Sequence, residues 1–397
     1  MKLLFLIADG MGGWPLDELD GKTVLEAART PNMDKLAATG VIGRASTIPQ
    51  GMPPGSDIAN MALLGFDPAK LHTGRGPIEA AAQGLKLQPD DLIWRLNLVQ
   101  VTDLTTEGRM LDYSSGHIPT EESTPLINRL QELLGGEAFS FAPGIQYRHL
   151  LIQPGGAKEP EANILVRPPH DITDQSVKPD LMAFSKSAAL WDLVHEAHEI
   201  LSRPDNQTKA NAIWPWGQGR PLNLPNFRET FGLSGAVISA VDLIKGLGRA
   251  AGMEVLEVDG ATGLLDTNYE GKVAAALDFL QRGDFVFLHV EAPDECGHAG
   301  DVKDKIEAIE RFDARIAGPV MQALDPSEAA YFVACDHLTP IAKRTHVSDP
   351  VPFLLAGPGI KASGAPAFNE KTAAASNLLI DEGHELLPFV LQSLGLK

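Results

Sequence analysis

Alternating apolar runs and helical segments limit this chain to a small set of folds. Residues 3–8 are apolar without a break and are followed by Asp9-Gly10. That pattern is typical of a strand covered on both faces in a parallel sheet. Similar runs recur later with helical segments between them, which predicts an α/β fold built on a doubly wound, mostly parallel sheet. Further strands are expected at 235–240, 253–258, 285–290, 330–334 and 351–356, and helices at 241–250, 269–281 and 301–324.

The middle of the chain has a different pattern. Short strands are expected at 92–101, 147–152 and 163–166, mixed with helices and with loops rich in Pro, Gly and Asn, such as 214–226. A chain of 397 residues has room for two domains. We therefore expect a smaller α+β lid domain at 76–230, inserted into a core domain formed by 1–75 and 231–397.

The charge balance narrows the possible partners. Lys and Arg total 33 and Asp and Glu total 52, so the formal net charge is −19. Such a surface repels nucleic acid and anionic membranes. No apolar run is long enough to span a bilayer, and the first one ends at Asp9, too early for a signal peptide. Two cysteines, Cys296 and Cys335, fit a reducing compartment. We expect a cytoplasmic protein, without a nucleic-acid or membrane partner, and favour a monomer.

Side chains suited to metal binding and nucleophilic chemistry occur where the predicted strands end. In an open α/β sheet, ligands bind beyond the carboxyl ends of the strands, so these side chains are expected to converge. Three carboxylates and three imidazoles suit two divalent cations, which can activate a serine hydroxyl for phosphoryl transfer. Ser56 lies where a helix is predicted to begin, and a helix N-terminus favours an anion. The residues are Asp9, Ser56, Asp294, His298, Asp336, His337 and His346.

Each of these residues, taken alone, also has an ordinary structural interpretation. Asp9 could be a turn residue, and Ser56 could be only an N-cap. Asp294 and His298 are one helical turn apart and could form a surface pair. His346 could be a buried, hydrogen-bonded histidine. Their shared position beyond predicted strand ends favours the functional interpretation.

A family resemblance supports that interpretation. The stretches that carry it include Asp9-Gly10-Met11, Thr30-Pro31-Asn32, Gly55-Ser56-Asp57, Arg95-Leu96-Asn97, Gly260-Ala261-Thr262-Gly263, Asp294-Glu295-Cys296-Gly297-His298 and Ser348-Asp349-Pro350. Their order resembles the alkaline phosphatase superfamily. Within it, the chain closely resembles the archaeal-type cofactor-independent phosphoglycerate mutases over essentially its whole length.

The resemblance implies a two-metal phosphoserine mechanism. It assigns one metal ion to Asp9, Ser56, Asp336 and His337, and the other to Asp294, His298 and His346. Ser56 would take the phosphate of 3-phosphoglycerate and return it to the 2-hydroxyl of the bound glycerate. Manganese, zinc, magnesium or cobalt would serve as the metal. No bisphosphoglycerate would be needed.

Such a mutase must hold glycerate while excluding water, and the inserted domain is expected to act as a lid. Arg95 and Arg148 are candidates for bidentate contacts to carboxylate or phosphate. His117 and His149 could move a proton, although a structural hydrogen bond is an equal alternative for both. Asn60, one helical turn after Ser56, could help to orient the substrate phosphate, and Arg75, near the domain boundary, could be a phosphate contact or a hinge.

Three alternatives remain open on the sequence. The stretch Arg344-Thr345-His346-Val347-Ser348-Asp349-Pro350 resembles a bacterial branch that includes proposed homoserine kinases, although a Gly-x-x-x-x-Gly-Lys phosphate loop is missing from the sequence. A metal phosphatase would share the core without a sealed lid. A non-enzymatic relative would be expected to lack some of the metal ligands.

Overall fold

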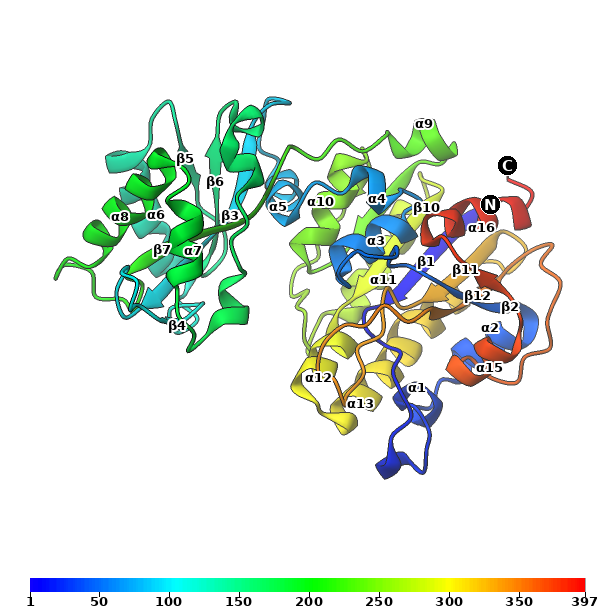
Figure 1. The fold of residues 1–397 in the computed structure, drawn as a ribbon. Coiled ribbons are helices and arrows are strands. Elements are labelled where there is room, and N and C mark those ends of the chain that lie inside the picture. Colours follow the sequence, from blue (N-terminus) through cyan, green and yellow to red (C-terminus); the bar gives the residue numbers. More distant parts are fainter. Residues whose placement is uncertain (397) are drawn as a thin grey trace. The chain divides into compact units, whose positions relative to one another are not determined.

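The computed structural model describes residues 1–396, and its contacts divide the chain into two compact units. One unit combines Met1–His72 with the chain from Asn223 onward, and the other is Thr73–Leu222. Figure 1 shows that strands from both ends of the chain share one sheet in the first unit. The inserted segment forms a second sheet with its own helices.

The sheet of the first unit is mostly parallel, as predicted. Strand β1 (Lys2–Ala8) lies in the middle, with parallel neighbours on both sides. Strand β12 (Val351–Ala356) is antiparallel to both of its neighbours, and the other pairings in the sheet are parallel. In spatial order the strands are β13 (Leu379–Ile380), β2 (Val41–Ala45), β12, β11 (Ala329–Ala334), β1, β10 (Phe285–Val290), β8 (Gly235–Ile238) and β9 (Glu254–Val255).

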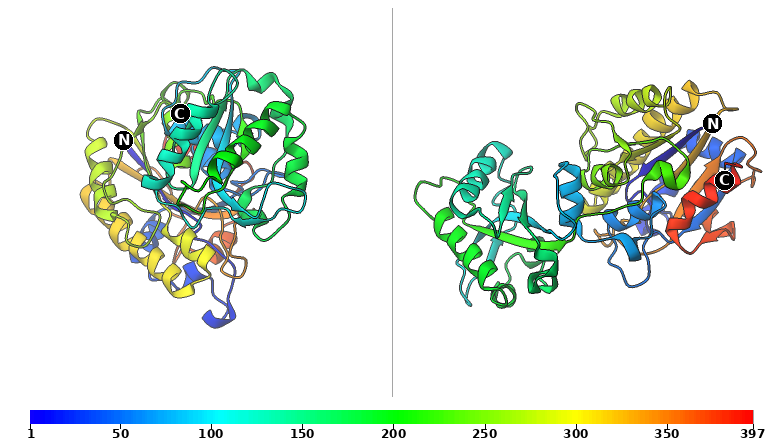
Figure 2. Two further views of the ribbon diagram at one scale, coloured as in Figure 1. Left: turned by 90° about the vertical axis from the view of Figure 1, so that its left-hand side faces the viewer. Right: turned by 90° about the horizontal axis from the view of Figure 1, so that it is seen from above.

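Helices cover both faces of this sheet (Figures 1 and 2). They bury the continuous apolar strands, and the rings of Phe5 and Phe332 stack at 4.3 Å in the core between β1 and β11. The helices are α1 (Val24–Ala27), α2 (Pro31–Thr39), α3 (Ser56–Leu63), α4 (Pro68–Leu71), α9 (Phe227–Phe231), α10 (Asp242–Ala250), α11 (Tyr269–Phe279), α12 (Ala292–Ala299), α13 (Val302–Phe312), α14 (Gly318–Ala323), α15 (Glu370–Ala375) and α16 (Leu386–Ser393).

The second unit is an antiparallel sheet packed against helices. Strand β3 (Leu92–Val101) pairs with β4 (Met110–Asp112), β6 (Arg148–Gln153) and β7 (Ala212–Gly219), and β5 (Ser140–Ala142) extends the sheet beyond β6. Its core contains Trp94 and Trp214, which are fully buried. The helices of this unit are α5 (Arg75–Ala82), α6 (Thr120–Leu134), α7 (Lys178–Phe184) and α8 (Ala188–Leu201).

Several local predictions were wrong. Residues 163–166 form no strand, because the chain makes a 3-10 turn at Pro160–Asn163 and then continues irregularly. The start of the predicted 214–226 loop belongs to strand β7, whose two tryptophans pack into the core. The single helix expected at 301–324 is divided by a π-helical turn at Asp313–Ala317, just before Pro319. The expectation for the cysteines is not among these errors, since Cys296 and Cys335 are both buried and neither forms a disulfide.

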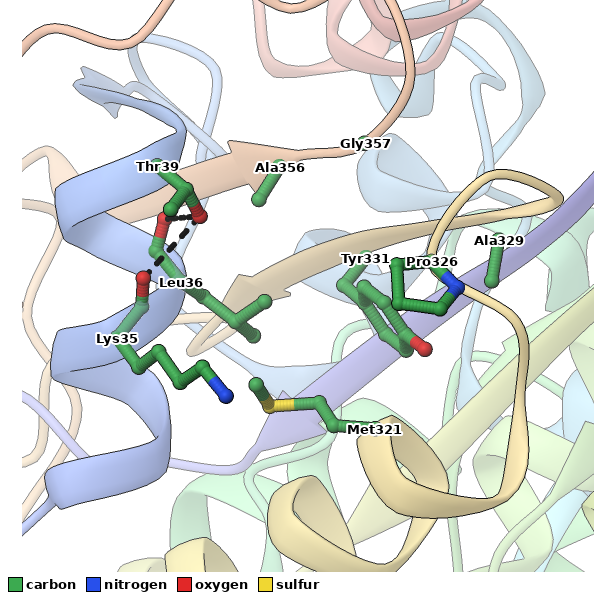
Figure 3. A pocket seen from close by; sticks show the side chains of 9 residues that line it. All are labelled: Lys35, Leu36, Thr39, Met321, Pro326, Ala329, Tyr331, Ala356 and Gly357. Atoms are coloured by element: carbon green, nitrogen blue, oxygen red, sulfur yellow. Dashed lines mark hydrogen bonds between the residues drawn. The ribbon is translucent and has the colours of Figure 1, made fainter.

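A cavity of about 300 Å³ lies at one edge of the first unit's sheet, near the amino end of β11. Figure 3 shows the side chains of Leu36, Met321 and Tyr331 facing one another across it. Because β11 begins here, this edge is opposite to the one where Asp9 and Asp336 follow their strands. None of the helices in residues 1–396 is both long enough and apolar enough to cross a bilayer.

Candidate metal centre and nucleophile

The carboxyl ends of three parallel strands bring the polar residues to one edge of the sheet. Asp9 directly follows β1, Asp336 comes two residues after β11, and Asp294 lies in the first turn of α12, which follows β10. Gly10 makes this approach possible. Its φ is +59°, and a Cβ there would lie 2.4 Å from Oδ1 of Asp294. A side chain at this position would therefore be strained and would collide with Asp294.

One cluster of possible ligands contains Asp9, His289 and Asp336, all fully buried. One ligand atom from each lies within 4.8 Å of the others. Nε2 of His289 lies 3.0 Å from Oδ2 of Asp9 but makes no hydrogen bond, and Oδ1 of Asp9 has no hydrogen-bond partner among the described residues. Because a buried polar atom without a hydrogen bond is costly, this arrangement suits a further group, and a cation would satisfy both atoms.

A second cluster contains Asp294, His337 and His346. His298 joins it, since its Nε2 lies 3.1 Å from Oδ2 of Asp294 and 2.9 Å from Nε2 of His346. The position of His298 follows from the helix, because residues four apart in α12 lie on the same face. Three imidazoles and a carboxylate lying this close together form a donor set that suits a transition metal or zinc.

His337 lies between the two clusters and the serine. Its Nε2 is 3.0 Å from Oγ of Ser56, 3.4 Å from Oδ2 of Asp336 and 3.5 Å from Oδ1 of Asp9. The structure thus brings His337 close to the first cluster. A ring nitrogen of His337 also lies within 4.8 Å of possible ligand atoms of Asp294 and His346.

Ser56 is the first residue of α3, and its hydroxyl does not cap the helix. The N-cap is Gly55, and no side-chain capping bond is present. The ordinary interpretation of Ser56 as an N-cap is therefore wrong, and its Oγ is directed to His337 instead. Backbone N–H groups at this helix end would stabilise an anion on Ser56.

Electrostatics supports a cation in this region. Burial raises the pKa of Asp9 well above its usual value, and the carboxylates of Asp336 and Asp294 raise it further. Burial opposes ionisation of Asp294 as well, but hydrogen bonds from His298 and His346 hold its pKa well below the usual range. Carboxylates packed this closely repel one another, so positive charge among them lowers their energy.

The pKa values of two histidines, His298 and His289, are shifted in opposite directions. The hydrogen bond to Asp294 raises the pKa of His298 to about 9, whereas burial lowers the pKa of His289 to about 4. His298 would have to lose its proton before it could bind a cation. His289 is neutral at pH 7, the form in which imidazole binds metals.

Asn60 lies at the same edge but contacts the protein rather than open space. Its Nδ2 donates to Oδ2 of Asp336 at 2.8 Å and to the backbone oxygen of Ser56 at 2.9 Å. The amide therefore fixes a candidate ligand relative to the serine. The role of Asn60 in orienting the substrate phosphate stays a prediction, since both of these hydrogen bonds are made to the protein.

In the second unit, Arg95 lies in a basic and aromatic cluster. Its guanidinium is 4.5 Å from the Trp216 ring centre and forms a 2.9 Å ion pair with Glu79. The Nε atom of Arg95 is buried and has no hydrogen-bond partner. Burial lowers the pKa of Arg95, and the positive charge of Arg75 contributes to the shift. An unused buried donor beside a second arginine is suited to an anionic group.

The remaining predicted lid residues are more dispersed. His117 has a φ of +53° and its ring meets that of Tyr147 edge to face at 6.2 Å. The guanidinium of Arg148 lies 5.7 Å from the Tyr147 ring centre. His149 is almost fully buried, and its Nδ1 accepts a hydrogen bond from the Gly144 N–H. The Nδ1 bond supports the structural interpretation of His149, whereas its buried Nε2 has no hydrogen-bond partner among the described residues.

The sequence analysis missed two residues of these clusters. His289 is a polar residue inside the apolar run 285–290, and that position was a usable signal. His170 packs against the Trp216 ring at 5.4 Å and the Tyr113 ring at 6.1 Å. His170 stands in the stretch Pro168-Pro169-His170, but the two rings that it meets come from distant segments of the chain.

A doubly wound α/β fold with oxygen and nitrogen donors at its carboxyl edge defines a metal-binding enzyme class. Residues 1–391 match the model of the Metalloenzyme superfamily, and the chain belongs to this family. It is 45% identical, over 99% of its length, to a 2,3-bisphosphoglycerate-independent phosphoglycerate mutase of Methanosarcina barkeri, which is covered completely (100%). A probable 2,3-bisphosphoglycerate-independent phosphoglycerate mutase of Geobacter sulfurreducens is 43% identical over 98% of this chain and 100% of its own length. A solved Pyrococcus horikoshii protein has a TM-score of 0.83 at 30% identity, with 100% and 98% of the two chains covered.

Proposed function

We propose that this chain is a 2,3-bisphosphoglycerate-independent phosphoglycerate mutase, which interconverts 3-phosphoglycerate and 2-phosphoglycerate. The observation that carries the proposal is the position of Ser56. Its Oγ lies at a helix N-terminus, 3.0 Å from Nε2 of His337 and beside two clusters of metal donors. Full-length relatives at 43–45% identity with this named activity support it.

The donor set fits two divalent cations, of which manganese and zinc suit mixed carboxylate and imidazole ligands best. Asp9, Asp336 and His337 would hold one beside Ser56, and Asp294, His298 and His346 would hold the other. His289 is an additional candidate at the first position, because its Nε2 lies 3.0 Å from Oδ2 of Asp9. Bound cations would favour the serine alkoxide and neutralise charge on the phosphate.

The chemistry of the protein groups balances in two steps. First, Oγ of Ser56 bonds to phosphorus as the bond from phosphorus to O3 of the glycerate breaks. The serine hydroxyl loses a proton, and O3 of the glycerate gains one. Second, O2 of the same glycerate bonds to phosphorus as the bond from phosphorus to Oγ of Ser56 breaks. The 2-hydroxyl loses its proton, and Ser56 regains one. No water or second phosphate donor is consumed.

The second unit would bind the glycerate and keep water from the phosphoserine. Arg95 is the strongest candidate for the carboxylate, because its Nε is a buried donor without a partner. Arg75, Arg148 and His117 are further candidates for substrate contacts. We further propose that the enzyme works as a cytoplasmic monomer on a small phosphorylated substrate.

The test is a coupled assay with purified protein and manganese, without bisphosphoglycerate. Wild-type protein should form 2-phosphoglycerate, and both EDTA treatment and Ser56→Ala should abolish this activity. Lys361→Ala, a change at an exposed position in the same unit, should leave the activity unchanged. Phosphate release without 2-phosphoglycerate would instead identify a phosphatase, and activity with ATP and homoserine alone would identify a kinase of the same family.

A further inference from the structure

Thr339 occupies an unusual position between the two clusters of metal donors. It is fully buried, and its hydroxyl donates a hydrogen bond to Oδ1 of Asp294. The same oxygen lies 3.3 Å from Nδ1 of His337. One threonine therefore touches the carboxylate of one cluster and the imidazole that connects both.

The single proton of the Thr339 hydroxyl bears on which ring nitrogen of His337 carries a hydrogen. A threonine hydroxyl has one proton and two lone pairs. Because an ionised Asp294 can only accept, the threonine proton belongs to that hydrogen bond. The 3.3 Å contact between Nδ1 of His337 and the threonine oxygen is then a hydrogen bond only in the tautomer in which Nδ1 carries the hydrogen and donates it. In that tautomer Nε2 of His337 is unprotonated, and it lies 3.0 Å from Oγ of Ser56.

Two glycines leave room for the side chain of Thr339 between the clusters. A Cβ on Gly10 would lie 2.6 Å from Oγ1 of Thr339, and a Cβ on Gly297 would lie 2.8 Å from its Cγ2. Gly10 follows the candidate ligand Asp9, and Gly297 lies on α12 between Asp294 and His298. Both ligand-bearing segments thus carry glycine where they meet this one side chain.

Lys305 fixes the backbone of Thr339 from the other side. This fully buried lysine of α13 donates from Nζ to the carbonyl oxygen of Thr339 at 2.6 Å and to that of Gly12 at 3.4 Å. The N–H of Thr339 also donates to the Gly12 oxygen at 3.2 Å. The loop after β11 is consequently tied to the loop after β1, which begins with Asp9.

We propose that Thr339 is a positioning residue that sets Asp294 against His337 and holds His337 with Nε2 free to act, while Lys305 holds Thr339 in place. The inference rests on the proposed function, because it assigns a purpose to the geometry of that metal centre. Outer hydrogen-bond partners of metal ligands typically change metal affinity by about 10–100-fold when they are removed.

The test compares Thr339→Val with Thr339→Ser and a matched control. Valine has nearly the same shape but no hydroxyl, whereas serine retains the hydroxyl. Thr30→Val is the control, because Thr30 is also buried and donates to an aspartate, Asp34, at 3.4 Å. Asp34 is not among the residues of either donor cluster.

The readouts are titration of metal-free protein with Mn²⁺ by calorimetry and the visible spectrum of the Co²⁺ form. Thr339→Val should weaken one binding event by about 10–100-fold and change the Co²⁺ spectrum, and Thr339→Ser should restore both. Thr30→Val should match the wild type in both readouts. If Thr339→Val does not fold, nitrogen NMR of the metal-free wild type still reports whether Nδ1 of His337 carries the proton.

The results separate the two hypotheses. If Thr339→Val binds Mn²⁺ as tightly as Thr30→Val with an unchanged Co²⁺ spectrum, Thr339 is not a positioning residue, even if the wild type is an active mutase. A His337 protonated on Nε2 in the NMR measurement overturns the inference equally. A wild type that binds no divalent cation and has no mutase activity refutes the proposed function, and the role of Thr339 with it.

Discussion

A buried histidine, His149, should make the second unit sensitive to acid. His149 on β6 is 1% exposed, and its Nδ1 accepts the Gly144 N–H at 3.0 Å. Burial lowers its pKa to about 3, with a backbone hydrogen bond at Gln146 opposing the shift. Protonation at Nδ1 would also remove the acceptor for Gly144. The folded unit therefore resists a proton that the unfolded chain takes up at about pH 6.5.

The sign and size of the effect follow from proton linkage. Between about pH 6.5 and about pH 3 the unfolded state binds the extra proton, so stability falls as the pH falls. Two pH units below the unfolded pKa, at about pH 4.5, the loss is about 2.7 kcal/mol, since each unit is worth about 1.36 kcal/mol. The carboxylates of the unit add their own pH dependence to this loss.

The assay compares urea unfolding of wild type and His149→Asn at about pH 7 and about pH 4.5. Asparagine can still accept from Gly144 but does not titrate. Four of the five tryptophans lie in the second unit, so fluorescence reports on its unfolding. The wild type should lose about 2.7 kcal/mol more than the variant between the two pH values. His195→Asn, on α8 of the same unit, controls for loss of an imidazole. Equal losses in wild type and His149→Asn would refute the reasoning.

Three further perturbations have defined outcomes. Arg95→Met leaves the nearly buried Glu79 without its ion-pair partner. Urea unfolding of the second unit should then show a loss of about 3–5 kcal/mol in the free energy of unfolding. A second substitution in the same chain, Glu79→Gln, should largely restore it. Phe5→Ala removes a fully buried ring that stacks on Phe332, and calorimetry should show a loss of about 3–5 kcal/mol in the first unit. Removing the metal with EDTA should lower the unfolding temperature of the first unit, because a cation at 100 times its dissociation constant stabilises the folded state by about 2.7 kcal/mol. An unfolding temperature unchanged by EDTA would contradict the electrostatic account of the donor clusters.

The sequence was most informative where structure depends on near neighbours. The runs 3–8 and 285–290 are apolar on both faces, and they became β1 and β10 almost residue for residue. The spacing of Asp294 and His298 indicated one helical turn, and α12 contains both. Hydrophobic period and helix geometry are local properties, so they can be recognised from a single chain.

Predictions that depended on distant partners were less successful. Strand β2 was not foreseen, because Val41–Ala45 becomes a strand through its pairing with β12 and β13. The direction of β12 could not be read from its composition, since it depends on the path of the chain between Ala334 and Val351. Strand β7 was placed partly in a loop because it contains Pro215 and Gly217.

For the functional site, the sequence alone determined which chemical groups are present and that most of them follow strands. Asp9, Asp336 and Asp294 could be recognised because a parallel sheet directs the ends of its strands to one edge. Only the tertiary structure placed His289 beside Asp9, Ser56 beside His337, and Thr339 between Asp294 and His337. These distances depend on how separate loops pack. No local pattern encodes them, because Thr339 and Asp294 are 45 positions apart in the sequence and Ser56 and His337 are 281 apart.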